Sequence, residues 1–165
     1  MDNGSQSQVL PGRPADLSAR FNSCLVVSGK TPITPQVEED LHKICQQITK
    51  IDVDSLYADV FDLIDLVSLI KLVSPYDAVI GDIPLPVQWQ IMRYIKKPVL
   101  VFEMETVGTA WSFEEALDLL EKYRNGNDGA IDLPSSKDKP YRVSVYRGIR
   151  WINEIRSTGV PIIRH

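Results

Sequence analysis

A short apolar run that stops at a glycine and a lysine constrains this chain more than any other feature. The run Cys24–Val27 is long enough to cross a sheet as a buried strand, and Ser-Gly-Lys-Thr follows it at residues 28–31. Pro35 then opens a helical pattern, and proline is common in the first turn of a helix. A buried strand that delivers glycine, lysine and hydroxyl groups to a helix N-terminus is typical of phosphate sites, because backbone N–H groups and partial positive charge meet there. This segment therefore predicts a phosphate or nucleotide ligand.

Apolar strand patterns alternate with helical patterns along most of the chain. The predicted strands cover residues 21–28, 50–54, 76–80, 99–102 and 141–146. The predicted helices cover residues 35–49, 56–72 and 87–95, and a further helix opens at the capping box Ser112–Glu115. Residues 149–155 could continue the last strand through a bulge or start a helix, and the strand is favoured. Alternation of this kind predicts an α/β fold, a Rossmann-like three-layer sandwich with a mostly parallel central sheet and an antiparallel C-terminal edge strand.

The length of the chain limits the number of domains, and its net charge limits the kinds of partner that it can bind. A chain of 165 residues fits one domain, here residues 21–158, between a polar N-terminal tail over 1–20 and a short C-terminal tail over 159–165. A net charge of −4 argues against a protein that grips duplex nucleic acid, because such binding requires a basic surface.

The cysteines and the apolar segments indicate the cellular compartment in which the protein is expected. Cys24 and Cys45 lack metal-ligand spacing, so we expect two buried thiols in a reducing cytosol. The most apolar segment, residues 56–73, carries several aspartates and does not predict a membrane span. The first twenty residues lack the apolar core of a signal peptide. A cytoplasmic protein is expected, and no motif indicates a metal or an organic cofactor.

Three predicted loops follow strands at the edge where α/β sheets bind ligands, namely residues 28–34, 81–86 and 103–109. The first is not a Walker A loop, because Cys24 occupies the position where that motif requires a glycine. It could instead contact a single phosphate, or be an ordinary strand-to-helix connection. Asp82 could accept a hydrogen bond from a ribose hydroxyl or cap the next helix. Gln88 could recognise a base. The candidate binding residues are Ser28, Gly29, Lys30, Thr31, Gly81, Asp82, Gln88, Glu103 and Thr106.

Catalytic motifs are absent from the sequence. One catalytic hypothesis is that Lys30 and Ser28 position a ribose 2′-hydroxyl against its neighbouring phosphate, a reaction that depends on placement and charge stabilisation. Whether the protein is an enzyme stays open at this point.

The segments VVSGKTPITP, YDAVIGDIPLPVQWQIM and KPVLVFEM follow one another over residues 23–104. This layout resembles the small Rossmann-fold proteins of CRISPR loci that are related to CARF domains and bind cyclic oligoadenylate second messengers. The resemblance implies a homodimer that holds the ring across its two-fold axis, without a cofactor, and that sequesters the ring or cleaves it slowly without a metal. It implies ligand contacts from residues 28–31 and from Gly81, Asp82 and Gln88.

Two other functions fit the same pattern. One is an enzyme that acts on nucleosides or nucleotides, of deoxyribosyltransferase-like type, with Asp82, Glu103 or Glu105 as the carboxylate nucleophile. The other is a non-catalytic interaction protein in which the loops are structural.

Overall fold

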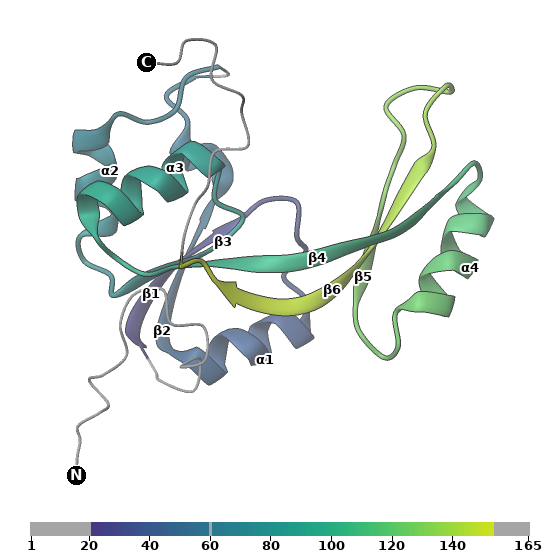
Figure 1. The fold of residues 1–165 in the computed structure, drawn as a ribbon, viewed down its shortest axis with the longest axis horizontal. Helices are drawn as coiled ribbons and strands as arrows, with labels where there is room; N and C mark the ends of the chain where they lie inside the picture. The colour runs from purple at the N-terminus through teal and green to yellow at the C-terminus, as the bar shows by residue number, and fades with distance from the viewer. Residues whose placement is uncertain (1–20, 60, 154–165) are drawn as a thin grey trace, which may run out of the picture.

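The computed structural model describes residues 21–59 and 61–153, and the predicted tails over 1–20 and 159–165 lie outside these residues. The described chain forms one six-stranded sheet with the strand order β2-β1-β3-β4-β6-β5 (Figure 1). Its strands are β1 (Phe21–Ser28), β2 (Cys45–Asp52), β3 (Ala78–Gly81), β4 (Val99–Ala110), β5 (Gly129–Asp132) and β6 (Tyr141–Trp151). Its helices are α1 (Pro35–Ile44), α2 (Leu66–Val73), α3 (Leu85–Gln90) and α4 (Phe113–Tyr123), with a 3-10 turn at Val53–Leu56 and a π-helical turn at Ile91–Ile95.

The α/β class is confirmed, but the sheet is mixed. Strands β2, β1, β3 and β4 pair in parallel, whereas β6 pairs antiparallel with both β4 and β5. The antiparallel strand β6 therefore lies inside the sheet, and the edge is formed by β5, which the sequence analysis missed. In Figure 1 the long β4–β6 ribbon bends away from the parallel half and carries β5 and α4 at its far end.

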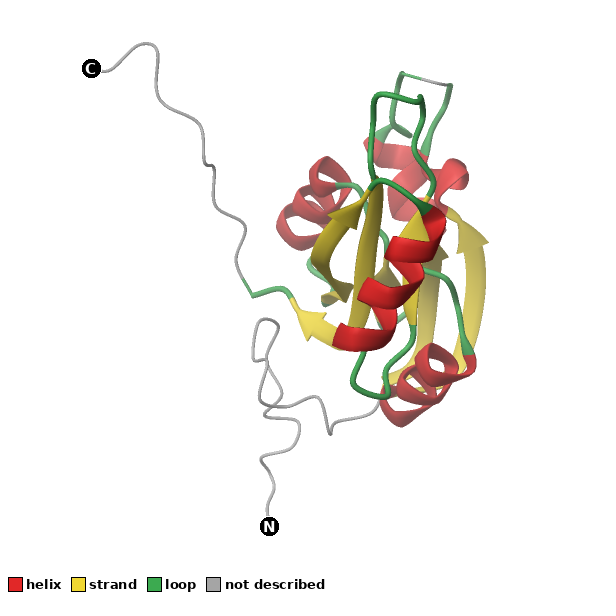
Figure 2. Cartoon of the chain, turned by 90° about the vertical axis from the view of Figure 1, so that its right-hand side faces the viewer, coloured by secondary structure: helices red, strands yellow, loops and turns green. Residues whose placement is uncertain are grey.

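The parallel half is covered by helices on both faces (Figure 2). Alternate residues of β1 enter two separate apolar cores: Cys24 and Val26 pack with α1, while Leu25 and Val27 pack with α2 and α3. All four are fully buried. This explains the continuous apolar run, because a strand buried on both faces needs no polar alternation.

The helix predicted over 56–72 is wrong in its first half. Asp59 accepts hydrogen bonds from the N–H groups of Phe61 and Asp62, and Asp65 accepts from the N–H of Ser68 as the N-cap of α2. Aspartates that bond nearby backbone groups favour turns and helix starts over helix interiors. The helix therefore begins only at Leu66, and Asp59 and Asp65 belong to a turn and to the helix cap.

Two other boundaries differ because strand pairing overrides local pattern. The helix predicted over 35–49 ends at Ile44, and β2 starts at Cys45 because its backbone pairs with β1 from Phe21 onward. The strand predicted over 99–102 continues to Ala110, because β6 pairs with it along its full length. Residues Glu103 and Thr106 are therefore part of a strand and not of a loop. The favoured strand interpretation of the C-terminal region is confirmed as far as Trp151.

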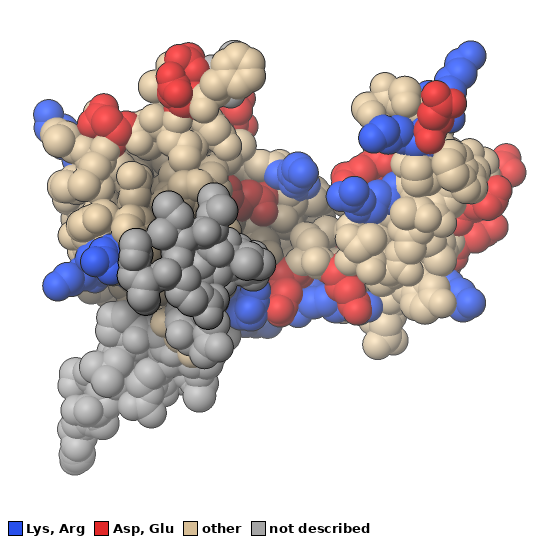
Figure 3. All heavy atoms as spheres, turned by 45° about the horizontal axis from the view of Figure 1, so that its top comes forward, with Lys and Arg blue, Asp and Glu red and all other residues tan. Residues whose placement is uncertain are grey.

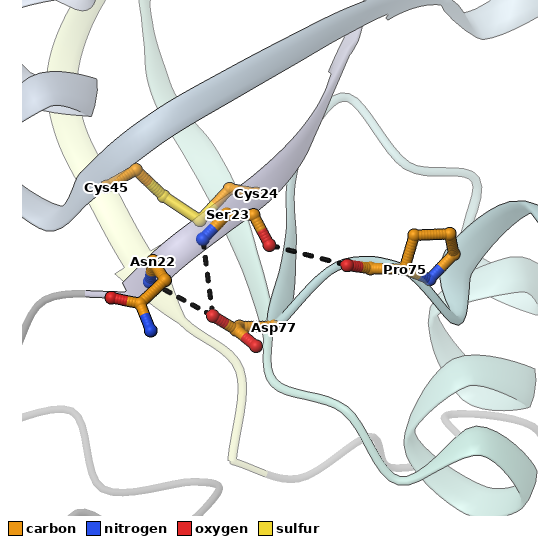
Figure 4. The surroundings of a disulfide bond; sticks show 6 residues. All are labelled: Asn22, Ser23, Cys24, Cys45, Pro75 and Asp77. Carbon is orange, nitrogen blue, oxygen red and sulfur yellow. Dashed lines mark hydrogen bonds between the residues drawn. A yellow bond between two sulfur atoms is a disulfide. The ribbon is translucent and has the colours of Figure 1, made fainter.

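A disulfide replaces the two free thiols expected from the sequence. Cys24 in β1 is bonded to Cys45 at the start of β2, at a sequence separation of 21 residues (Figure 4). Both cysteines are at most 1% exposed. Beside them, the carboxylate of Asp77 accepts hydrogen bonds from the N–H groups of Asn22 and Ser23, at 3.0 and 3.2 Å. The first strand is thus fixed to β2 by a covalent bond and to the start of β3 by these hydrogen bonds.

A buried tyrosine joins the two halves of the molecule. The Tyr146 hydroxyl in β6 donates to Asp40 Oδ2 in α1 at 2.8 Å, and the tyrosine is 3% exposed. Burial, together with the adjacent carboxylate, raises the pKa of Tyr146 well above its ordinary value of 10.0.

Raising the pH above 10 should therefore destabilise the protein. The unfolded chain releases this proton near pH 10 while the folded chain retains it, so the stabilisation is complete below that pH and is lost as the pH rises further. Tyr146→Phe should lower the free energy of unfolding by about 1 kcal/mol at neutral pH and flatten its decline above pH 10. Urea unfolding between pH 8 and pH 11 measures both effects, with Tyr123→Phe as the control for loss of a surface hydroxyl. An unchanged alkaline slope in Tyr146→Phe would contradict this role.

Candidate functional site

A cleft of about 640 Å³ opens at the carboxyl ends of β1 and β3, where parallel sheets collect ligands. The loop after β1 forms one wall, and the turn after β3 with the start of α3 forms another. The first residues of β4 and the end of β6 supply the floor and the remaining side. Its lining residues are Gly29, Lys30, Val53, Tyr57, Gly81, Asp82, Ile83, Pro84, Leu85, Gln88, Val101, Phe102, Arg150 and Ile152.

The close approach of β3 to β1 forms the base of the cleft. Gly81 has a φ of +128°, and a Cβ atom added to it would overlap the carbonyl oxygen of Val27. That same carbonyl accepts a hydrogen bond from the N–H of Asp82 at 2.9 Å. Only glycine fits this turn, because it combines positive φ with a close backbone approach. The turn directs the next residue, Asp82, toward the first loop.

Asp82 fastens the two loops together. Its Oδ2 accepts from the N–H of Thr31 at 2.7 Å, and its Oδ1 accepts from the Thr31 hydroxyl at 2.9 Å. Thr31 is 4% exposed, so these bonds satisfy buried polar groups that would otherwise be costly. Asp82 does not cap α3, whose start at Pro84 has no side-chain cap. Instead this pair holds Gly29 and Lys30 in place at the rim.

Two cationic side chains border the cleft. Lys30 is exposed and makes no hydrogen bond or ion pair with any residue within 21–59 or 61–153. Arg150 reaches the cleft from β6, and its Nε lies 3.2 Å from Glu103 Oε2 in an exposed ion pair. An incoming anion would therefore meet one lysine that forms no ion pair with the described residues and one arginine that is already paired with Glu103.

The other walls are apolar or weakly polar. Gln88 donates from Nε2 to the carbonyl of Ile83 at 2.8 Å. This hydrogen bond fixes the side-chain amide and stabilises the turn after β3. Tyr57 lines the cleft from the segment after β2 and is 38% exposed. A cleft lined by cationic side chains and an aromatic ring can accommodate a phosphate together with an aromatic base.

The structure brings together five of the predicted site residues and separates the others. Gly29, Lys30, Gly81, Asp82 and Gln88 line the cleft. The other predicted residues do not line it: Ser28 donates its hydroxyl to Ile51 O at 3.3 Å, Thr31 is bound to Asp82, Glu103 pairs with Arg150, and Thr106 lies near Ser144.

Sequence reasoning missed Arg150 and Tyr57. Arg150 enters the cleft because β6 returns antiparallel beside β4, a long-range pairing that no local pattern encodes. Tyr57 was placed inside a helix that does not form there. The aspartate spacing around it was the available signal, because Asp-rich segments favour turns.

The candidate nucleophiles of the enzyme hypothesis are all engaged. Both oxygens of Asp82 accept hydrogen bonds from Thr31, Glu103 pairs with Arg150, and Glu105 pairs with Arg147 Nε at 2.7 Å. Of these three, only Asp82 lines the cleft. None therefore stands as a free carboxylate against the space that a sugar would occupy.

Comparison of the chain with protein-family models, with curated protein sequences and with solved structures gives no match. The described residues contain no cluster of three or more His, Cys, Asp or Glu side chains suited to a metal ion. Within the same part of the chain, every helix is too short or too polar to cross a membrane.

Proposed function

We propose that the cleft binds the phosphate-bearing part of a nucleotide. The observation that carries this proposal is Lys30, an exposed lysine without a partner among the described residues, held over a cleft at the carboxyl ends of parallel strands. The Asp82–Thr31 hydrogen bonds hold the lysine's loop in place before any ligand arrives. Such preorganisation lowers the entropy that binding must otherwise overcome.

The dimensions and the lining agree with a ligand of this class. A volume of about 640 Å³ falls within the range of roughly 300–1,000 Å³ that is usual for small-molecule sites. Lys30 and Arg150 supply charge for phosphate oxygens, and Tyr57 supplies an aromatic surface for a base. The apolar residues Val101 and Phe102 of β4 form the floor of the cleft.

The specific ligand proposed is a cyclic oligoadenylate of CRISPR antiviral signalling, bound by a homodimer, as the resemblance of residues 23–104 implies. The parallel half of the sheet with its helices is then a Rossmann-like sandwich extended by the β4–β6–β5 ribbon. Sequestration fits the contacts better than cleavage, because the Ser28 hydroxyl is bonded to Ile51 O and does not line the cleft beside Lys30.

The proposal includes a cytoplasmic site of action. Disulfides are uncommon in reducing compartments, where thiolates exchange with accessible sulfur atoms. The Cys24–Cys45 bond lies in the apolar core beneath α1, and both cysteines are at most 1% exposed. Such burial limits attack by cellular thiols.

A thermal-shift screen with adenosine monophosphate, other nucleotides and cyclic tetra-adenylate tests this function. A ligand that binds only the folded state raises the melting temperature. Lys30→Ala should weaken the binding of any stabilising nucleotide by about 10- to 100-fold, the loss expected for a charge-assisted hydrogen bond to phosphate. Lys137→Ala removes the same charge from the distant β5–β6 loop and should leave affinity unchanged. Insensitivity to every nucleotide would instead favour the non-catalytic interaction protein.

A further inference from the structure

Four elements form an arm beyond the parallel half of the sheet: the outer parts of β4 and β6, the strand β5 and the helix α4. Figure 1 shows this arm at the right of the molecule. Strand β5 (Gly129–Asp132) ends the strand order, so within residues 21–59 and 61–153 it pairs with a strand on one side only. Its open side is called the β5 edge below. An edge strand presents backbone N–H and C=O groups with which a further strand can pair.

The pairing with β6 determines which backbone groups of β5 point to its open side. The N–H of Tyr146 donates to the carbonyl of Asp128 at 2.8 Å, so these two residues form a hydrogen-bonded pair. Such pairs alternate with non-bonded pairs along an antiparallel ladder, and the backbone groups of Ala130 therefore also point to β6. Gly129 and Ile131 occupy the intervening pairs, so their N–H and C=O groups point away from β6 to the open side.

Helix α4 (Phe113–Tyr123) covers one face of the arm, and two glycines show how it is placed. A Cβ atom added to Gly108 in β4 would meet the side chain of Leu119, and one added to Gly129 in β5 would meet that of Leu120. Leu119 therefore lies over β4, and Leu120 lies over β5. One flank of α4 thus faces the β5 edge, and the other flank faces β4.

The flank of α4 that faces the β5 edge is apolar and half-exposed. Phe113 and Leu117 precede Leu120 by seven and three positions, which places all three on one side of the helix. Phe113 is 47% exposed and Leu117 is 45% exposed. Beside them, Ile131 packs against α4, and Leu133, two positions further along the same face, is 73% exposed. A strand added at the β5 edge would bury part of this apolar surface.

The other open edge of the arm carries charged side chains. Strand β3 is short and pairs with β4 through Val99 and Leu100, so the outer part of β4 also has an open side within the described chain. That part carries Glu103 and Glu105, and the flank of α4 that faces it carries Glu115. Charged side chains on an edge strand oppose the addition of a further strand. Of these two edges, the β5 edge is therefore the better suited to accept a strand.

We propose that the β5 edge binds an extended segment of another protein, which adds antiparallel to β5 and widens the sheet. The backbone of the segment would exchange hydrogen bonds with Gly129 and Ile131. Every second side chain would lie on the α4 side, against Phe113 and Leu117. Strand addition of this kind obtains affinity from main-chain hydrogen bonds and selectivity from alternate side chains. The surface lies outside the cleft, and its binding requires no nucleotide.

Asp132 defines the charge of the segment. Its side chain lies on the face of β5 away from α4, because it alternates with that of Ile131. The carboxylate is exposed and forms no hydrogen bond or ion pair with any residue within 21–59 or 61–153. Its neighbour across the ladder is Arg142 of β6. A lysine at the paired position of the added strand would leave the carboxylate between two cations, and opposite charges on paired positions stabilise a sheet.

The surroundings of the β5 edge favour a basic foreign segment over a second copy of this chain. Glu114 and Asp118 are exposed on α4, and Figure 3 shows acidic groups along the right border of the arm. Pairing of two β5 strands would bring a second set of carboxylates to this edge, where like charges oppose association. The expected segment therefore has apolar residues at alternate positions and a lysine or arginine between them.

Titration of the nitrogen-15-labelled full chain with the capped pentapeptide Val-Lys-Val-Thr-Val, without nucleotide, tests the proposal. Paired antiparallel with β5, the peptide places its valines on the α4 side and its lysine opposite Asp132. The amide signals of Gly129 and Ile131 should shift, whereas those of Gly29 and Gly81 in the cleft should stay in place. Glutamate in place of the peptide's lysine should weaken binding several-fold, and Asp132→Lys should reverse that preference.

Methylated peptides separate backbone pairing from non-specific apolar contact. N-methylation of the central valine removes the N–H that would bond Ile131 and should weaken binding by about 10-fold or more. N-methylation of the threonine, whose N–H would point away from β5, adds the same group and should leave the affinity nearly unchanged. Equal affinities of the two methylated peptides would overturn the proposal.

Variants of the protein test the same hydrogen bonds from the other strand. Ile131→Pro removes the outward N–H, which an edge strand can lack without loss of a bond to its neighbour, and should abolish binding. Ile131→Ala keeps this N–H and controls for the loss of the side chain. Leu117→Lys should weaken binding several-fold, whereas Val67→Lys at an exposed position of α2 should not alter it. Circular dichroism verifies that each variant is folded.

Three further results would overturn the proposal. The first is the absence of shifts at β5 with millimolar peptide, and the second is unchanged binding by Ile131→Pro. The third is a shift of the β5 signals with protein concentration in the absence of peptide, which would show that β5 pairs with a second copy of the chain. The cleft takes no part in these measurements, so failure at the β5 edge and failure of the proposed nucleotide site are distinguishable.

Discussion

Replacing Gly81 by alanine is expected to destabilise the protein by about 3 kcal/mol or more and to abolish ligand binding at the cleft. Two effects add: a side chain at a φ of +128° is strained, and its Cβ would overlap the backbone oxygen of Val27. Backbone cannot move aside as a flexible side chain can. Relief requires β3 to shift away from β1, which would also displace Asp82 from Thr31 and release the loop that carries Lys30. Urea unfolding measures the loss.

Gly148 provides a matched control for this prediction. It has a φ of +132°, and a Cβ added to it would meet nothing within 4 Å. Gly148→Ala should therefore show the cost of backbone strain alone, about 1–3 kcal/mol. The difference between the two variants isolates the overlap with Val27. Equal losses in both would show that the close approach of β3 to β1 does not limit this turn.

Breaking the Cys24–Cys45 disulfide is expected to lower the stability by about 3 kcal/mol. The bond closes a loop of 21 residues between β1 and β2 and thereby restricts the unfolded chain. For a chain of this size the loss corresponds to a decrease in melting temperature of about 6–12 °C. The comparison is between oxidised and reduced wild type, which differ only in the bond.

A double variant, Cys24→Ala with Cys45→Ala, controls for other effects of the reductant. Its melting temperature should not respond to reductant, although it should lie below that of the oxidised protein. Thiol labelling of the denatured, unreduced wild type should find no free cysteine, because the two cysteines of the chain are bonded to each other. Two labelled thiols would contradict the disulfide.

The parts of the fold that follow from local chemistry could be predicted from the sequence. The apolar run in β1, the threonine cap and proline of α1 and the capping box of α4 each specify their element through neighbouring residues. The turns after β1 and β3 were located for the same reason. As a result, five of the fourteen residues that line the cleft were already candidates.

The parts of the fold that depend on pairing between distant strands could not be predicted from the sequence. The extent of β4 is set by β6, some forty residues later, and β5 is a short, half-exposed strand that exists because β6 pairs with it. Arg150 enters the cleft through the same pairing. The disulfide depends on the register of β1 with β2, which places Cys45 beside the first strand and not within a helix.

Thr31 and Asp82 have the residue types of a ligand site but serve the structure of the protein itself. Their residue types suggested contacts to a phosphate and a ribose, yet in the structure they bond each other. A buried threonine and a carboxylate at the ends of adjacent strands satisfy each other's hydrogen bonds, which a sequence pattern cannot reveal. What remains for a ligand is Lys30, which that pair supports.

Amide chemical-shift mapping tests most directly whether this cleft is the ligand site. The protein, labelled with nitrogen-15, is titrated with adenosine monophosphate and separately with cyclic tetra-adenylate. We expect the amide signals of Gly29, Lys30, Gly81 and Gln88 to shift with a common affinity that Lys30→Ala weakens. Shifts confined to residues outside the cleft, or no shifts at millimolar nucleotide, would contradict the proposed function.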